Sequence, residues 1–244
     1  MNMKFASFGL QDKNADMLGL SELLVEYPLA EVFIPLSEKN SSFSAPGWSW
    51  VSSLVFFINS RRNLVNTSLS IEGIWSEAFC KGMEIKEISS LLNMKDCNGD
   101  YFFKRIMLSL PPAVCNSKYV AKLAYIIKKY PLRRFVLPYN KDSESLIADL
   151  YRLGISFDLI YDDDFCFRKK PVYSPPVYTD IVQGYSGGLT PGNLVNRLDI
   201  ISKVNSANTF IYAKNGLHNS FGLLDIEKCA RYLARATKWK HNIV

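Results

Sequence analysis

The stretch DIVQGYSGGLTPGN, residues 180–193, contains one complete change from strand to helix. The apolar pair Ile181-Val182 predicts a strand, and two adjacent glycines at 187–188 let the backbone turn with its N–H groups facing outward. Thr190 is suited to cap a following helix, and Pro191 is suited to its first turn. Free N–H groups and a positive helix end attract anions, so this turn is either a phosphate site or an ordinary connection.

The same change from strand to helix recurs along the whole chain. Eight short runs of apolar, β-branched and aromatic residues predict strands buried on both faces, at Phe5–Leu10, Glu31–Leu36, Asn66–Ile71, Lys104–Leu110, Arg134–Tyr139, Phe157–Tyr161, Asp180–Gly184 and Thr209–Ala213. Stretches with one apolar stripe predict helices at Met17–Glu26, Trp48–Asn59, Ser117–Lys129, Ser143–Arg152, Pro191–Ser202 and Asp225–Ala236.

Two rounds of this alternation are less regular. Helical residues of the third round are spread between Ile74 and Leu92, and no helix is expected after the sixth strand, because residues 167–177 contain three prolines. Strict alternation implies right-handed parallel crossovers. Eight rounds therefore predict an α/β fold, a closed eight-stranded parallel (βα)8 TIM barrel, forming a single domain over residues 1–244.

Composition excludes several classes of protein. A hydrophobic content of 48% with 21% charged residues is ordinary for a globular chain. Five widely spaced cysteines without a C-x-x-C pair, together with two histidines, favour neither a disulfide framework nor a metal site, so no cofactor or metal is expected. No apolar run suits a membrane span or a signal peptide, which predicts a cytoplasmic protein.

The net charge of +6 is carried by short, scattered clusters of Lys and Arg. The longest, Arg168-Lys169-Lys170, lies in the proline-rich stretch, and no nucleic-acid motif accompanies it. Solvated helix ends explain such clusters better than a nucleic-acid groove does. An anionic small-molecule ligand is equally compatible with this charge.

In a (βα)8 barrel, the chemistry is placed at the carboxyl ends of the strands. The glycine turn follows the seventh predicted strand and Asn215-Gly216 follows the eighth, which is where many barrels bind a phosphate group. The sequence therefore predicts a phosphate site made of Ser186, Gly187, Gly188, Asn215 and Gly216.

Four ionisable residues at strand ends are candidates for acid–base catalysis: Asp162, Glu72, Asp12 and Lys214. Carboxylates around one cavity serve as acid and base when their environments separate their pKa values. The aspartates at 162–164 are alternatively a loop anchor, a solvated run or a water-mediated Mg²⁺ site. Lys214 suits a phosphate contact better than a Schiff base.

Aromatic residues near strand ends have two interpretations. Tyr139, Tyr185 and Tyr212 either stack on a substrate ring or belong to the core between strands and helices. Lys104 begins the fourth predicted strand, so it is expected near the opposite end of the barrel.

Residues 184–194, GYSGGLTPGNL, resemble the Ala-Gly-Gly-Leu-x-Pro-x-Asn-Val phosphate loop of phosphoribosylanthranilate isomerase, a barrel of tryptophan biosynthesis. They look still closer to an uncharacterised, divergent group of isomerase-like barrels. Further segments in register with that group are residues 30–37, 43–48 and 224–228. The resemblance implies the barrel and its phosphate loop.

The departures from this family are specific. The isomerase has a general-base cysteine at the end of its first strand, where residues 6–10 read ASFGL, and a general-acid aspartate after its fifth, where residues 138–140 read PYN. Asp162 matches an aspartate that follows the family's sixth strand, but Asp163 and Asp164 replace the glycines beyond it. The acidic pair that ends strand eight in the isomerase-like group is absent. The resemblance therefore speaks against phosphoribosylanthranilate isomerase activity itself.

The leading hypothesis is a barrel enzyme that acts on a small phosphorylated metabolite, a sugar phosphate or phosphoribosyl compound. Asp162, Glu72 and Lys214 would transfer protons in an isomerase or, second, a lyase reaction. The alternative is a non-catalytic barrel that binds a phosphorylated ligand or a protein partner, and a homodimer stays open. The fold alone does not choose between them.

Overall fold

A computed structural model describes residues 1–10, 15–37, 48–60, 65–161 and 173–241 of the chain. Eight parallel strands pair in sequence order, and the first also pairs with the eighth, which closes the barrel. The strands are β1 (Asn2–Gly9), β2 (Ala30–Leu36), β3 (Asn66–Ile71), β4 (Phe103–Leu108), β5 (Arg134–Pro138), β6 (Phe157–Tyr161), β7 (Gln183–Tyr185) and β8 (Asn208–Ala213). The predicted (βα)8 fold is confirmed.

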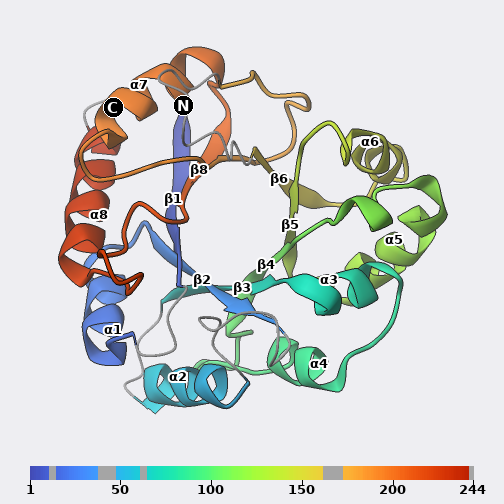
Figure 1. The fold of residues 1–244 in the computed structure, drawn as a ribbon, viewed down its shortest axis with the longest axis horizontal. Coiled ribbons are helices and arrows are strands. Elements are labelled where there is room, and N and C mark those ends of the chain that lie inside the picture. Colours follow the sequence, from blue (N-terminus) through green and yellow to red (C-terminus); the bar gives the residue numbers. More distant parts are fainter. Residues whose placement is uncertain (11–14, 38–47, 61–64, 162–172, 242–244) are drawn as a thin grey trace.

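Helices surround the barrel on its outside (Figure 1). They are α1 (Met17–Glu26), α2 (Trp48–Ser60), α3 (Gly73–Cys80), α4 (Lys86–Leu92), α5 (Val120–Lys129), α6 (Glu144–Arg152), α7 (Leu194–Val204) and α8 (Ile226–His241), with short 3-10 turns at Pro112–Val114 and Ser117–Tyr119. Within the described residues, no helix has the length and apolar character that crossing a membrane requires.

Most predicted elements lie where the pattern put them, and the exceptions have local causes. The predicted start of the seventh strand, Asp180, is three residues too early. Asp180 lies in a turn and accepts a hydrogen bond from the Tyr151 hydroxyl, and β7 begins at Gln183. Helix α7 starts at Leu194 rather than Pro191: Thr190 caps a separate turn, its Oγ1 accepting from the Asn193 amide at 3.3 Å. The third round contains two helices, α3 and α4.

Two apolar layers form the core. The larger one lies between the strands and the surrounding helices. The smaller one fills the barrel itself and consists of Phe33, Val136, Ile160, Phe210 and Tyr212, all nearly or completely buried. Inward-facing residues of neighbouring strands thus pack against one another, as expected for a barrel whose interior is solid rather than a pore.

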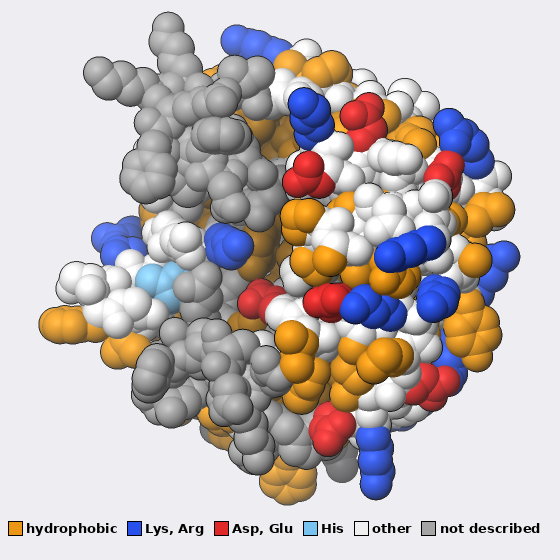
Figure 2. Space-filling model, turned by 45° about the vertical axis from the view of Figure 1, so that its right-hand side comes forward, with side chains coloured by type: hydrophobic (Ala, Val, Ile, Leu, Met, Phe, Trp, Pro, Cys, Tyr) orange, Lys and Arg blue, Asp and Glu red, His pale blue; other side chains and the backbone are white. Residues whose placement is uncertain are grey.

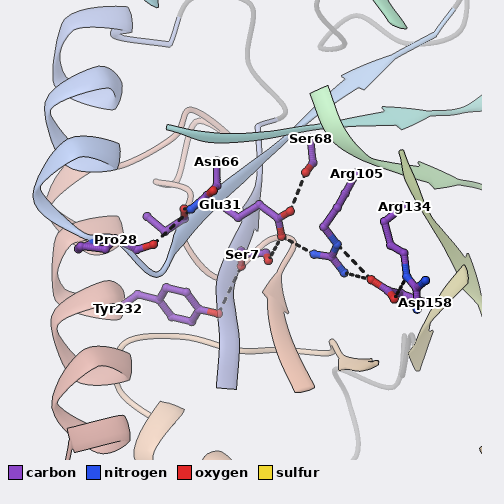
Figure 3. A network of polar contacts seen from close by, with 10 residues as sticks. Ser7, Pro28, Glu31, Asn66, Ser68, Arg105, Arg134, Asp158 and Tyr232 are labelled. Carbon is purple, nitrogen blue, oxygen red and sulfur yellow. Dashed lines mark hydrogen bonds and ion pairs between the residues drawn. The ribbon is translucent and has the colours of Figure 1, made fainter. Parts of the chain in front are cut away.

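A charged network occupies the barrel interior beside this apolar layer, and the sequence analysis did not predict it (Figure 3). Arg105 on β4 donates from Nη1 to Glu31 at 2.6 Å and from Nη2 to Asp158 at 3.1 Å. Ser7 and Ser68 also donate to Glu31, at 2.5 and 2.6 Å. All five side chains are buried, so each charge is compensated where water is excluded.

Candidate functional site

The loops that follow β7 and β8 lie against each other at the carboxyl end of the barrel. Gly187 and Gly188 have φ angles of +99° and +58°, in the left-handed region that glycine adopts without strain. Neither amide donates a hydrogen bond to another described residue. Gly216 of the second loop packs directly on the backbone of Leu189. The predicted glycines of the two loops are therefore brought together.

The other two predicted phosphate residues differ from these glycines. The Ser186 amide donates to the Tyr161 carbonyl at 2.9 Å, so this N–H group continues the sheet and is not directed at a ligand. The Ser186 side chain is buried, while Asn215 is exposed beside Gly216. The amides of the two glycines thus differ from that of Ser186, because they donate to no described residue.

Asn193 stabilises the loop that contains Gly187 and Gly188, although it was not among the predicted site residues. Its Nδ2 donates to the Gly188 carbonyl at 2.8 Å, and its Oδ1 accepts from the Thr190 amide at 2.9 Å. One side chain thereby fixes the path of the backbone on both sides of Leu189. The signal available in the sequence was its place three residues after Thr190, a spacing typical of side chain-to-backbone turns.

A cavity of about 220 Å³, the mouth cavity, opens at the same end of the barrel. Its polar lining comes from the ends of four strands: Ser70, Glu72, Ser109, Asn140, Tyr212 and Lys214. Two of the three predicted catalytic residues, Glu72 and Lys214, are therefore brought to one cavity, both half-buried. The third, Asp162, lies outside the described residues, as do Asp12 and the other two aspartates of the run.

Glu72 is held by local contacts. It follows β3 and precedes α3, and its amide donates to the Leu36 carbonyl at 3.0 Å, which continues the β2–β3 pairing. The Ser70 hydroxyl donates to Glu72 Oε1 at 3.2 Å and orients the carboxylate. Among the described residues, no three His, Cys, Asp or Glu side chains converge in a way that would hold a metal ion.

The tyrosines near the strand ends have separate roles. Tyr185 is completely buried and its hydroxyl donates to the Ser174 carbonyl at 3.1 Å, so of its two interpretations the structure supports a place in the core. Tyr161 lies between Tyr139 and Tyr185, with ring centroids 5.3 and 5.6 Å away, and burial raises its pKa to about 12. Tyr212 alone of the three candidates lines the mouth cavity.

The charged surface agrees with the expected scatter of basic residues. On the face shown in Figure 2, Lys and Arg side chains are interspersed with Asp and Glu side chains. The described side chains on this face therefore form no basic stripe of the kind typical of a nucleic-acid interface.

Comparison with known proteins places this geometry in a structural context. No protein-family model matches the chain, and no curated protein matches its sequence. Among solved structures, phosphoribosyl anthranilate isomerase from Thermus thermophilus is similar at 12% identity over 98% of this chain and 99% of that one, with a TM-score of 0.55. TrpF from Jonesia denitrificans is similar at 11% identity over 96% and 97%, with a TM-score of 0.56.

A third isomerase structure, from Thermotoga maritima, is 13% identical over 96% of this chain and all of that chain, with a TM-score of 0.53. One isomerase structure, with a TM-score of 0.51, is a complex with reduced 1-(o-carboxyphenylamino)-1-deoxyribulose 5-phosphate. These similarities establish the fold, and they agree with the resemblance to a divergent isomerase-like (βα)8 barrel that the glycine loop carries.

Proposed function

We propose that this barrel is an enzyme that binds a sugar phosphate or phosphoribosyl compound and moves protons on it. The observation that carries the proposal is the meeting of Glu72 and Lys214 at one cavity, on the same end of the barrel as the Gly187-Gly188 turn. A phosphate bound to those two glycine amides would anchor the substrate, and the rest of the molecule would extend across the mouth cavity. No cofactor or metal is needed for this chemistry.

Each group has a distinct role in the proposed reaction. The Glu72 carboxylate, held by the Ser70 hydroxyl, accepts a proton from the carbon beside the substrate carbonyl. The Lys214 ammonium stabilises the negative charge that develops on the carbonyl oxygen. An isomerisation is complete when that proton returns to the former carbonyl carbon, and Lys214 gives a proton to the former carbonyl oxygen and takes one from the adjacent hydroxyl. Loss of a leaving group from the enolate instead completes a lyase reaction. Asp162 is the third proposed catalytic residue. This role rests only on its resemblance to the aspartate that follows the sixth strand in the isomerase family.

Two further parts of the proposal concern the setting of the protein. The described cysteines Cys80, Cys97, Cys115 and Cys229 are free thiols, which suits a reducing cytoplasm. A homodimer is compatible with the fold and is tested by the mass of the protein in solution.

The first test is a thermal-shift screen of phosphorylated metabolites on the wild type and on Gly188→Asp. Binding to the folded state raises the melting temperature by mass action. An aspartate tolerates a left-handed backbone, so the variant should fold while its carboxylate repels the phosphate. Gly192→Asp is the matched control, because Gly192 is exposed and an added Cβ would meet only Thr190 Oγ1, at 3.7 Å.

A melting shift that is lost in Gly188→Asp and kept in Gly192→Asp supports the phosphate site. The ligand so found is then assayed for turnover with Glu72→Gln and Lys214→Met, each expected to reduce kcat by a factor of about 10² or more. Binding without turnover in the wild type would favour the non-catalytic alternative. A shift indifferent to Gly188→Asp would leave the two glycines as an ordinary turn.

A further inference from the structure

A second and larger cavity, the basal cavity, opens at the amino-terminal end of the strands, opposite the mouth. Its volume is about 480 Å³, within the range of roughly 300–1,000 Å³ typical of small-molecule sites. The ends of α5 and α6 and the starts of β4 and β5 enclose it. Four cations line it, Lys104, Lys128, Arg133 and Arg134. The apolar part of the lining comes from Ile127, Pro131, Leu132 and Ile155.

Only one of these four cations has an acidic partner among the described residues. Arg134 donates from Nε to Asp158 at 2.6 Å, and Asp158 is also bound by Arg105, which in turn pairs with Glu31. Two carboxylates and two guanidiniums thus neutralise one another within this chain of contacts. The basal cavity gains no negative charge from it.

The remaining three cations are uncompensated. Lys104 and Lys128 are exposed and form no ion pair with any residue in the described ranges. Arg133 is buried, lies 3.0 Å from the centroid of the Tyr101 ring and donates to the Leu92 carbonyl. A cavity wall with three unbalanced positive charges has a potential that attracts anions.

Helix ends account for only part of this charge. Lys128 lies in the last turn of α5, where a cation is favourable because the helix carbonyls there are unpaired. Lys104 is the second residue of β4, and Arg133 lies just before β5, so no helix dipole explains their presence. The apolar half is also unusual, since Leu132 leaves 72% of its surface exposed at the rim.

We propose that the basal cavity binds a small organic anion with a flat apolar body. The carboxylate, sulfonate or phosphate ester lies between Lys104 and Lys128, and the hydrocarbon part covers Ile127, Leu132 and Ile155. Charge pairing fixes the orientation of the ligand, and burial of apolar surface supplies most of its affinity. This site is separate from the mouth cavity and does not depend on the proposed enzyme function.

The test uses 8-anilinonaphthalene-1-sulfonate, a fluorescent sulfonate with a flat aromatic body, titrated into the whole protein. We expect one saturable site whose affinity falls at least about tenfold in the double variant Lys104→Glu, Lys128→Glu, because two charge contacts are reversed. Lys86→Glu is the matched control, since Lys86 is an exposed lysine outside the cavity. Inorganic phosphate should compete only weakly, because it lacks the apolar part.

A second pair of variants tests the apolar half. Leu132→Asp should weaken binding, while Leu153→Asp should not, because Leu153 is 54% exposed and does not line the cavity. Both positions are exposed, so both variants should keep the native circular dichroism. The proposal is overturned if the dye binds the double lysine variant and Leu132→Asp as tightly as it binds the wild type. Gly188→Asp should leave dye binding unchanged, which separates this outcome from failure of the mouth site.

Discussion

Gly216 stands so close to Leu189 that a Cβ atom on residue 216 would lie 1.9 Å from the Leu189 carbonyl oxygen. No side chain fits in this space, so the loop after β8 supports the loop after β7 through direct contact with its backbone at Gly216. The proposed phosphate site therefore depends on a residue that does not itself need to touch the ligand.

Gly216→Ala should displace the glycine loop, because the new methyl group cannot be accommodated without moving backbone. We expect a lower melting temperature and at least about tenfold weaker binding of a phosphorylated ligand, measured by thermal shift and calorimetry. Gly192→Ala is the control in the same segment, where the added Cβ would make only an ordinary 3.7 Å contact. Equal ligand affinity in the two variants would contradict the supporting role of Gly216.

Asn193→Ala should loosen the same loop from within, since it removes the hydrogen bonds to Gly188 and Thr190. Their loss should reduce the free energy of unfolding by about 1–2 kcal/mol in a urea titration. Asn193→Asp keeps the oxygen that accepts from Thr190 but sets a carboxylate oxygen against the Gly188 carbonyl, so it should also be less stable than the wild type. An alanine variant as stable as the wild type would contradict the stabilising role of the Asn193 side chain.

Arg105→Ala should be strongly destabilising, because it leaves Glu31 and Asp158 as buried charges without their shared partner. We expect a loss of about 3–5 kcal/mol in the free energy of unfolding. Arg152→Ala removes an exposed ion pair with Asp149 and should cost less than about 0.5 kcal/mol in the same urea experiment. Similar losses of stability in both variants would contradict the conclusion that Arg105 compensates the buried charges of Glu31 and Asp158.

Alkaline pH should destabilise the fold through two buried thiols. Burial raises the pKa of Cys80 and that of Cys229 to about 12, from 9.0 for an exposed thiol. Above pH 9 the unfolded chain therefore releases protons that the folded chain retains, and stability falls as pH rises toward 12. The expected loss is about 1 kcal/mol per thiol between pH 8 and pH 10.

The measurement is the urea midpoint at pH 8 and pH 10. The double variant Cys80→Ala, Cys229→Ala should lose less stability over this interval than the wild type, whatever its starting stability. Cys97→Ala should behave like the wild type, because Cys97 is exposed. A pH dependence that is unchanged in the double variant would assign the alkaline loss to other groups, such as the buried tyrosines.

The fold was predictable because its signal is local and repeated. Asn66–Ile71 and Phe157–Tyr161 are strands with the expected bounds, and Met17–Glu26 is a helix with the expected bounds. Each depends on a few neighbouring residues, so no long-range information was required. The predicted start of β7 was wrong because the apolar pair Ile181-Val182 has the pattern of a strand, whereas the pairing with β6 begins only at Gln183.

The charged interior was not predictable, because its residues look like surface residues in the sequence. Arg105 follows Lys104 at the start of a strand, and its partners Glu31 and Asp158 are 74 and 53 residues away. Only closure of the barrel brings them together. The mouth cavity was partly predictable for the opposite reason: Glu72 and Lys214 each end a strand, and parallel strands place their carboxyl ends on one side.

The network around Arg105 extends from the barrel interior to the basal cavity. Its guanidinium lies 4.1 Å from the Phe210 ring centroid and contacts carboxylates on β2 and β6, so charged and aromatic side chains occupy the middle of the barrel. Arg134, which also pairs with Asp158, connects these buried charges to the wall of the basal cavity. Replacing Arg134 would therefore alter the cavity wall and the buried charges at once, whereas replacing Lys104 or Lys128 breaks no ion pair of this network.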